Sequence, residues 1–344
     1  MSTARRSLSV VIPTYNRAAL LRETLAAVLA QECPADEVIV VDDGSTDGTA
    51  QMLAGLGVRL LRQANAGDLA ARNTGLAAAS GDLVAFCDSD DLWRPGFLAA
   101  MQALWQAEPR LVAGFGNFRI IRNGAWLPDA KFGSAPPGFW DGLREVGPGL
   151  SVFDTPIVDR LIRFQPCFPS ALVVDRNHMR GIGGWDESVG RTVGTDFATM
   201  LRLAEHAPIG VVQAPLVGIR KHAGNYSADV QAMNLGDALI LEHVLARRPA
   251  LRPLASVIEA SVAARRGDAL DTAFARRDFA AVRAISRLLP TPGASRKAKM
   301  AVAALPAPMD RLASAALLML GSLRAQAWRS NAPIPGVERP SSHG

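Results

Sequence analysis

Apolar runs and helical spacings alternate over the first part of the chain. Four short runs rich in β-branched residues predict buried strands, at residues 8–12, 37–41, 58–62 and 83–87. Between them the apolar positions follow helical spacing, as at Leu21, Leu25 and Val28 and again over residues 68–79. This alternation predicts an α/β fold with a Rossmann-like, mostly parallel central sheet flanked by helices.

The pattern is less regular further along the chain. Asn123-Gly124 between apolar flanks predicts a hairpin with a type I′ turn, and residues 128–168 have no clear period and predict a long loop or lid. The remaining expected elements are a strand at 169–174, a helix at 195–205, and short strands at 209–212 and 217–219. Beyond residue 230 the pattern is helical. We therefore expect an α/β domain over residues 1–228 and a helical region over residues 229–344.

Composition and charge narrow the class of protein. Of the 344 residues, 49% are hydrophobic and 20% are charged, which excludes a disordered chain. Residues 241–344 carry 16 Lys and Arg against 7 Asp and Glu, whereas the preceding part is acidic overall. An acidic first part argues against nucleic acid as a partner along the whole chain.

The basic helical region has two interpretations. Its helices either pack on the first domain with their arginines in water, or lie peripherally on an anionic membrane surface through residues 310–329, with Trp328 at the interface. No uninterrupted apolar run reaches the ~20 residues of a membrane span, and no signal-peptide core is visible. Because the cysteines are few and scattered, we expect a cytoplasmic protein, at most peripheral on the inner face of the membrane.

Acidic turns follow two of the predicted strands. In Asp88-Ser89-Asp90-Asp91 three carboxylates repel one another unless a cation or hydrogen-bond donors compensate. Oxygen ligands in this number suit Mg²⁺ or Mn²⁺ shared with substrate phosphates; the alternative is a solvated turn that caps the next helix. Asp43, after the strand at 37–41, is placed to accept a hydrogen bond from a base or ribose.

Two further segments belong to the same predicted sheet edge. The loop at residues 13–17 follows the first strand, and there Tyr15 offers an aromatic face to a base; the alternative is an ordinary turn. Arg72, on the helix at 68–79, presents a guanidinium suited to phosphate or base oxygens, or else forms a surface salt bridge. The sequence has no GxGxxG or Walker pattern, which argues against a dinucleotide or P-loop site.

Four of these segments, in this order and spacing, resemble the family 2 glycosyltransferases with a GT-A fold. They are VVIPTYNR at 10–17, VIVVDDGSTDGT at 38–49, NAGDLAARNTGLAAASG at 65–81 and LVAFCDSDDLW at 83–93. A looser resemblance runs through residues 169–188, 194–205 and 220–227, so that it covers residues 7–227 and leaves the tail outside.

The resemblance implies a site for a nucleoside diphosphate sugar. The resemblance assigns ten residues to binding of this donor, from the base-binding loop, the residues that complete it, the DxD motif and the stretch that lines the sugar and acceptor pocket. They are Pro13, Thr14, Tyr15, Asn16, Asp43, Arg72, Asp88, Ser89, Trp185 and Asp186. Asp88 is expected to face the ribose. The metal, Mg²⁺ or Mn²⁺, is assigned to Asp90, with Asp91 and His222 as further candidate ligands.

The resemblance also implies a catalytic base. Asp196 matches the second residue of an acidic pair near a helix start, and Thr195 stands where the family usually has Glu. This departure leaves the class of acceptor open. It also keeps a catalytically degenerate, nucleotide-sugar-binding relative as an alternative.

The function implied is a metal-dependent, inverting transfer of a sugar from a nucleoside diphosphate donor, with UDP preferred, to a hydroxyl acceptor. The acceptor is expected to be a glycan or a lipid-linked sugar in cell-surface polysaccharide assembly. The alternative enzyme class is a sugar-nucleotide pyrophosphorylase. Such enzymes usually carry a glycine-rich first loop, whereas residues 13–17 contain no glycine.

Overall fold

The computed structural model describes residues 5–222, 229–289 and 291–319 of the chain. The chain divides into two units, one formed by residues 1–229 and 236–262, the other by residues 230–235 and 263–344. This division falls within helix α9 (Ala255–Ala275), whereas the sequence pattern places the boundary at residue 229.

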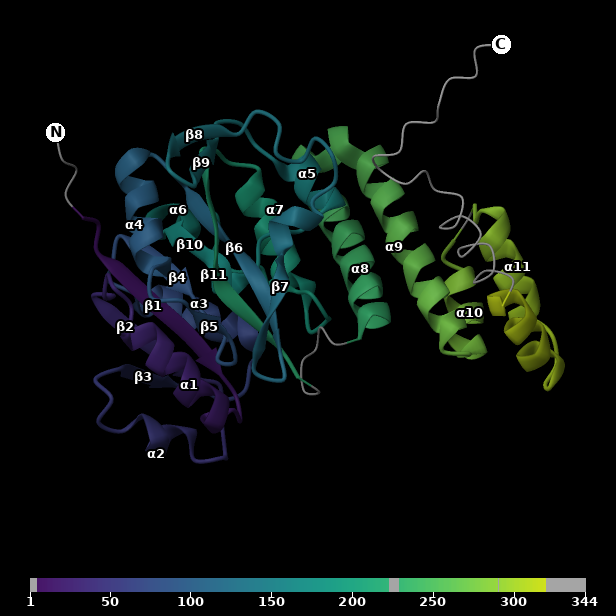
Figure 1. The fold of residues 1–344 in the computed structure, drawn as a ribbon, viewed down its shortest axis with the longest axis horizontal. Coiled ribbons are helices and arrows are strands. Elements are labelled where there is room, and N and C mark those ends of the chain that lie inside the picture. Colours follow the sequence, from purple (N-terminus) through teal and green to yellow (C-terminus); the bar gives the residue numbers. More distant parts are fainter. Residues whose placement is uncertain (1–4, 223–228, 290, 320–344) are drawn as a thin grey trace, which may run out of the picture. The chain divides into compact units, whose positions relative to one another are not determined.

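The first unit is built on one sheet of 11 strands (Figure 1). Its first part is parallel, in the order β3-β2-β1-β4. The bounds are β1 Leu8–Thr14, β2 Glu37–Asp42, β3 Arg59–Arg62 and β4 Leu83–Phe86. The prediction of parallel βαβ units is confirmed for this part of the sheet.

The other part of the sheet mixes strand directions. β10 (Leu172–Asp175) runs antiparallel between β4 and β6 (Ala113–Arg122), and β11 (Ile209–Lys221) runs parallel to β6. Shorter strands pair antiparallel with β6, with β11 or with each other: β5 Leu92–Trp93, β7 Ala125–Ala130, β8 Arg144–Gly147 and β9 Leu150–Phe153. The sheet is therefore parallel from β3 to β4 and mixed from β10 to β8, where only β6 and β11 pair in parallel.

Helices cover both faces of the sheet because the side chains of a strand alternate between the two faces. α1 (Ala18–Leu29), α2 (Thr49–Leu53) and α4 (Phe97–Ala107) pack on the face of Val10 and Ile12. The helices on the face of Val11 are α3 Asp68–Ala78, α5 Val158–Arg163, α6 Arg176–Gly181, α7 Asp196–Ala204 and α8 Val230–Arg247 from Gly236 onward. The expected flanking of the sheet by helices is confirmed.

The turn at Asn123-Gly124 is confirmed, with φ of 51° and 77° between β6 and β7. The long loop expected at residues 128–168 is wrong, because this segment holds the 3₁₀ helix η1 (Lys131–Ser134), the β8–β9 hairpin and α5. Its strands have only four residues each and leave no readable period. The two strands expected at 209–219 are one strand, β11, whose register is irregular around Pro215.

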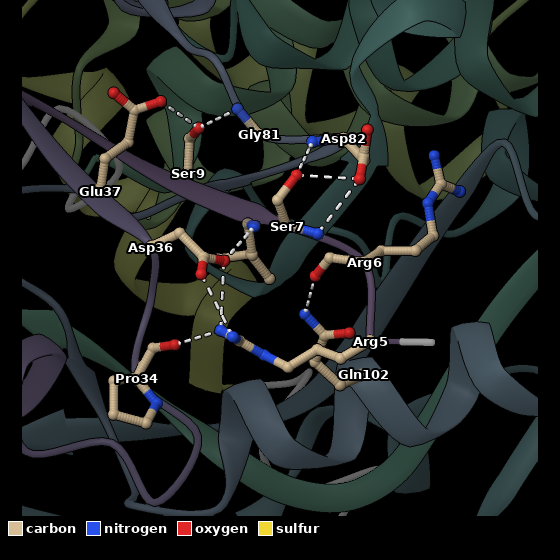
Figure 2. Close-up of polar contacts among 11 residues, drawn as sticks. Arg5, Arg6, Ser7, Ser9, Pro34, Asp36, Glu37, Gly81, Asp82 and Gln102 are labelled. Carbon is tan, nitrogen blue, oxygen red and sulfur yellow. Dashed lines mark hydrogen bonds and ion pairs between the residues drawn. The ribbon is translucent and has the colours of Figure 1, made fainter. Parts of the chain in front are cut away.

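The amino ends of β1 and β2 are tied together by polar side chains (Figure 2). Asp36 accepts the Leu8 N–H at 2.7 Å and the Arg5 guanidinium at 3.1 Å. Ser9 donates to Glu37, its register partner on β2, at 2.6 Å and accepts the Gly81 N–H at 2.9 Å. These bonds satisfy backbone groups at the strand starts and fix the register of β1.

The second unit is helical over its described residues. It holds the later part of α9, α10 (Phe279–Ser286), α11 (Ala294–Ala303) and helical residues 309–319 around an apolar core that includes Phe274. None of the described helices combines the length and the apolar character that crossing a bilayer requires. Trp328, to which the membrane-surface interpretation assigns the interface, lies outside the described residues.

Gly75 allows α3 to approach β1 closely, and this contact sets the position of Arg72 one turn earlier. A Cβ at residue 75 lies 2.3 Å from Val11 Cγ1 and 3.3 Å from Val11 Cβ, so rotation of the Val11 side chain does not relieve the clash. We expect Gly75→Ala to lower the free energy of unfolding by about 1–3 kcal/mol, as overpacking does, measured by urea denaturation.

The matched control is Gly181→Ala at the end of α6, where a Cβ meets nothing within 4 Å. We expect no loss of stability there. Equal stability of the Gly75 and Gly181 variants would contradict the tight packing of α3 on β1.

Candidate active site

Most of the residues singled out from the sequence come together at the edge where β1, β2 and β4 end. The loop after β1, the turn after β2 and the acidic turn after β4 lie there because parallel strands end at one edge of a sheet. The end of β11 also reaches this edge, since the Arg220 N–H donates to Asp91 at 2.8 Å. The side chains that the sequence predicts at one edge of the sheet thus lie together there.

The acidic turn is buried from Ser89 to Asp91, although its residues are polar, and Asp88 is partly buried. Asp90 and Asp91 are each 4% exposed. Asp91 accepts on both oxygens from protein donors, from Ser170 Oγ at 2.5 Å and from the Arg220 N–H. Burial, followed by the charges of Asp90 and Asp88, raises the pKa of Asp91 well above its usual range. Asp91 therefore anchors the turn to β11 and to the segment before β10.

Asp90 contacts nitrogen groups from two distant parts of the chain, a guanidinium and an imidazole. Its Oδ2 lies 2.5 Å from Arg17 Nη1 and 3.0 Å from His222 Nε2. Arg17 belongs to the loop after β1, and His222 directly follows β11. The carboxylate of Asp90 thereby joins the two segments that border the acidic turn.

Arg72 is a buried cation between two carboxylates. It is 4% exposed and donates to Asp68 and to Asp88, each at 2.6 Å. Burial lowers the pKa of its guanidinium, but Asp88 and Asp68 raise that pKa above the ordinary value overall. Arg72 therefore keeps its charge and holds Asp88 at the edge of the site.

Trp185, which is buried, and Asp186, which is half-buried, follow one another close to this group. The Trp185 ring is buried, meets Phe86 edge to face at 4.9 Å, and lies 4.9 Å from the Arg72 guanidinium. Asp186 accepts from the Ser188 N–H and hydroxyl. Asn73 on α3 clamps this segment by bonds to the Trp185 N–H and carbonyl. Trp185 thus acts on the site through Arg72, as a platform beneath the guanidinium.

The loops after β1 and β2 hold each other in shape. The Asn16 N–H donates to Ser45 Oγ at 2.9 Å, and Asn16 Oδ1 accepts the Thr46 N–H at 2.8 Å. Pro13 and Thr14 are buried beneath them, while Tyr15 is 48% exposed and presents its ring at the surface. An exposed aromatic ring on a braced loop is suited to stack on a planar base.

Asp43 organises the loop that leads into α3. Its carboxylate accepts from the side-chain amide of Gln63 at 2.8 Å and from the N–H groups of Ala66 and Gly67 at 2.9 Å each. A carboxylate has about four acceptor positions. Asp43 therefore braces the loop and keeps capacity for one further donor.

Asp196 is the first residue of α7 and is partly buried among charged groups. Burial raises its pKa to about 7 against the lowering effect of Arg72, and the charges of Asp237, Asp68 and Asp88 add to the rise. Gln165 Nε2 lies 3.4 Å from its Oδ2. A carboxylate whose pKa lies near neutrality is suited to take up a proton during a reaction.

The donor atoms around the acidic turn fit a hard divalent cation. Asp88 and Asp90 supply carboxylate oxygens and His222 an imidazole nitrogen, ligands that Mg²⁺ and Mn²⁺ accept. Within the described ranges, no three His, Cys, Asp or Glu side chains lie together in a way that could hold a metal ion. This arrangement matches Mg²⁺ in nucleotide sites, which uses one or two carboxylates and takes its other ligands from phosphates and water.

Several residues of the site have no signal in a single sequence. Ser170, which is fully buried, accepts the Asp88 N–H at 2.9 Å and donates to Asp91. Gln165 and Asp237 surround Asp196. Gln165 and Asp237 lie outside the segments of the resemblance; Ser170 lies within its segment 169–188 but was not singled out there, and all three reach the site through the tertiary fold. Arg17 also belongs to the site, because it contacts Asp90. Its place in the VVIPTYNR segment, directly after the predicted base-binding residues, is the feature of the sequence that points to it.

The fold is that of the GT-A glycosyltransferases. The mannosyltransferase PcManGT from Pyrobaculum calidifontis, solved with GDP-Man and Mn²⁺, superposes with a TM-score of 0.52 at 23% identity, over 96% of this chain and 89% of that one. TarS of S. aureus, residues 1–349 with UDP-GlcNAc, gives a TM-score of 0.52 at 17% identity, over 93% and 92% of the two chains. At these identities the likeness concerns the fold alone.

Residues 9–156 match the model of the family described as Glycosyl transferase family 2. An uncharacterized glycosyltransferase of Nostoc sp. is 39% identical over 105 residues, which are 29% of this chain and 33% of that protein. The succinoglycan biosynthesis protein ExoW of Rhizobium meliloti is 45% identical over 100 residues, 26% and 31% of the two chains.

A third relative carries a full activity in its name. WfgD of Escherichia coli, named as a UDP-Glc:alpha-D-GlcNAc-diphosphoundecaprenol beta-1,3-glucosyltransferase, is 34% identical over 120 residues, 34% of this chain and 47% of that protein. The matched segment thus spans between a third and a half of the length of the relatives in Nostoc and Escherichia coli. The resemblance to family 2 glycosyltransferases is confirmed over residues 9–156, which include the loops after β1, β2 and β4.

Ser170 is expected to stabilise the acidic turn. Ser170→Ala leaves the buried Asp91 carboxylate without one donor and the Asp88 N–H without its acceptor. We expect a loss of about 1–3 kcal/mol in the free energy of unfolding, the cost of an unsatisfied buried polar group, measured by urea denaturation at pH 7.

Ser286→Ala is the control, because this hydroxyl is exposed and bonds only locally, to the Arg283 carbonyl. It should leave the unfolding curve in place. If Ser170→Ala unfolds at the same urea concentration as the wild type, the two bonds do not hold the turn.

Proposed function

We propose that the chain is an inverting glycosyltransferase that moves a sugar from a UDP-sugar to a hydroxyl group of an acceptor. The observation that carries this proposal is that one cation, Arg72, acts on both the acidic turn and Asp196. Arg72 contacts Asp88 directly, and its charge acts on Asp196. One cluster therefore contains both a place for a diphosphate and a base whose pKa is about 7.

Donor binding is assigned to the loops at the ends of β1, β2 and β4. Tyr15 stacks on the base and Asp43 accepts from its edge or from the ribose, on the loops braced by Asn16 and Ser45. Asp88, held by Arg72, accepts from the ribose hydroxyl groups. UDP is proposed as the nucleotide because WfgD, a relative in sequence, is named for UDP-Glc.

Metal binding is assigned to Asp90, with Asp88 and His222 beside it. A bound Mg²⁺ or Mn²⁺ supplies Lewis-acid stabilisation of the charge that the departing nucleoside diphosphate acquires. Asp91 is left out of this ligand set because both of its oxygens serve Ser170 and Arg220. Arg17 adds a positive charge on the same carboxylate as His222.

Acceptor activation is assigned to Asp196. Its carboxylate takes the proton of the acceptor hydroxyl as that oxygen bonds to the anomeric carbon, while the bond from this carbon to the diphosphate oxygen breaks on the opposite face. Gln165 orients the carboxylate from one side. General base catalysis of this kind contributes typically ~10²–10⁴-fold to a rate.

The donor and the metal are tested by thermal unfolding with UDP-glucose or GDP-mannose, with and without Mn²⁺. We expect UDP-glucose with Mn²⁺ to stabilise the protein, by about 2.7 kcal/mol at 100 times the Kd. Asp90→Asn should abolish the part that depends on Mn²⁺, because it removes the charge that the cation binds.

The control for this variant is Asp129→Asn, an exposed carboxylate on β7. It should behave as the wild type. Stabilisation by GDP-mannose alone contradicts the choice of UDP, and the absence of any response to nucleotide sugars contradicts the proposed function.

The base is tested by the pH dependence of transfer. Since Asp196 is active as a carboxylate and its pKa is about 7, kcat/KM should rise about tenfold per pH unit below that value and level off above it. Asp196→Asn should retain UDP binding and lose ~10²–10⁴-fold in kcat.

Asp237→Asn provides a sharper test of the same assignment. Its charge raises the pKa of Asp196, so its removal should shift the midpoint of the pH profile to lower pH. An unchanged midpoint in this variant, or near-normal turnover of Asp196→Asn, would exclude Asp196 as the base.

A further inference from the structure

Arg17 stands at a position where a helix does not favour a cation. It is the N-cap of α1, and its side chain makes no capping hydrogen bond there. The N-terminus of a helix carries a partial positive charge and prefers Ser, Thr, Asp or Asn as its cap. A guanidinium at this position needs an anion to compensate for it. That anion is Asp90, whose Oδ2 lies 2.5 Å from Arg17 Nη1.

The backbone just before Arg17 is shaped for this contact. Asn16 has a φ of 50°, in the left-handed region that Asn adopts more readily than most residues. Its bonds to Ser45 and Thr46, in the loop after β2, hold it there. The chain therefore turns sharply between β1 and α1, and a separate loop stabilises the turn that brings Arg17 to Asp90.

Arg17 is less firmly held than Arg72, the other guanidinium at the acidic turn. The side chain of Arg72 is 5% exposed and bonds to two carboxylates. The side chain of Arg17 is 26% exposed, and within the described part of the chain Asp90 is the one carboxylate that it contacts. Arg17 can therefore leave its partner by rotation of a long side chain, without a change in the backbone.

The contact of Arg17 falls on the carboxylate that the proposed function assigns to the metal. Two positive charges on one carboxylate repel each other, so Arg17 and a divalent cation compete for Asp90. A cation that arrives alone must displace the guanidinium and leave it without a partner. When a diphosphate arrives as well, the guanidinium has a second anion to which it can move.

We propose that Arg17 is an exchangeable counter-ion of Asp90, which neutralises this carboxylate until the donor binds and then transfers to the diphosphate of the donor. This inference rests on the proposed function, because it names a residue that links metal and nucleotide in the same site. A guanidinium binds phosphate through paired N–H groups. The exchange makes metal and nucleotide favour the binding of each other.

The experiment measures the Kd of Mn²⁺ for the full chain by electron paramagnetic resonance, with and without saturating UDP. We expect UDP to tighten the binding of Mn²⁺ to the wild type. Without UDP, Arg17→Gln should tighten Mn²⁺ binding about tenfold, because the competing charge is gone. At saturating Mn²⁺ the same variant should bind UDP about tenfold more weakly, because the diphosphate loses a guanidinium.

Two further variants serve as controls. Arg17→Lys keeps the positive charge and should leave the Kd of Mn²⁺ near that of the wild type. Arg22→Gln is the matched control, since this arginine is exposed on the same helix α1. It should change the Kd of neither Mn²⁺ nor UDP.

Mn²⁺ binding that Arg17→Gln leaves unchanged, weakens or lacks altogether overturns the exchange and gives Arg17 a structural role only. UDP binding that this variant leaves unchanged or tightens overturns the transfer to the diphosphate. If neither the wild type nor the variant binds UDP, the proposed function fails and the transfer fails with it. The measurement of Mn²⁺ without UDP then still decides whether Arg17 competes for Asp90.

Discussion

Three carboxylates within four residues are stable in a buried turn only when each has compensating donors. In this protein the compensation comes from separate elements. Arg72 on α3 serves Asp88, Arg17 and His222 serve Asp90, and Ser170 with the Arg220 N–H serves Asp91. The donors come from α3, from the loop after β1, from the end of β11 and from the segment before β10. The carboxylates of one turn are therefore bonded to several separate segments along the edge of the sheet.

The same demand explains the properties of Asp196, the proposed base. Burial and neighbouring carboxylates raise the pKa of Asp196, and the charge of Arg72 prevents a larger rise of that pKa. The chain has Thr195 where related enzymes are expected to carry a second acid, and in the fold a negative charge reaches Asp196 from Asp237 on α8 instead. The position of a carboxylate in space thus matters more for this pKa than its position in the motif.

The sequence predicts the site best where its polar residues directly follow a predicted strand. The parallel strands, the acidic turn after β4, Asp43 and Arg72 could all be predicted, because local patterns place them at one edge. The commitment of Asp91 to Ser170 could not, since the two residues lie far apart in the chain and meet only through the pairing of β10 with β4. The burial of Trp185 beneath Arg72 and the pairing of β8 with β9 depend on tertiary packing in the same way.

The reversed direction of β10 has a consequence for how the site is assembled. Because β10 is antiparallel to β4, it begins where β4 ends, and the short helix η2 (Pro169–Ala171) that precedes it arrives at the ligand-binding edge. In an all-parallel sheet the residues before that strand would reach the opposite rim. A single antiparallel strand thus brings Ser170, from the middle of the chain, into contact with the acidic turn. We therefore expect insertions or deletions just before η2 to displace the aspartates of that turn.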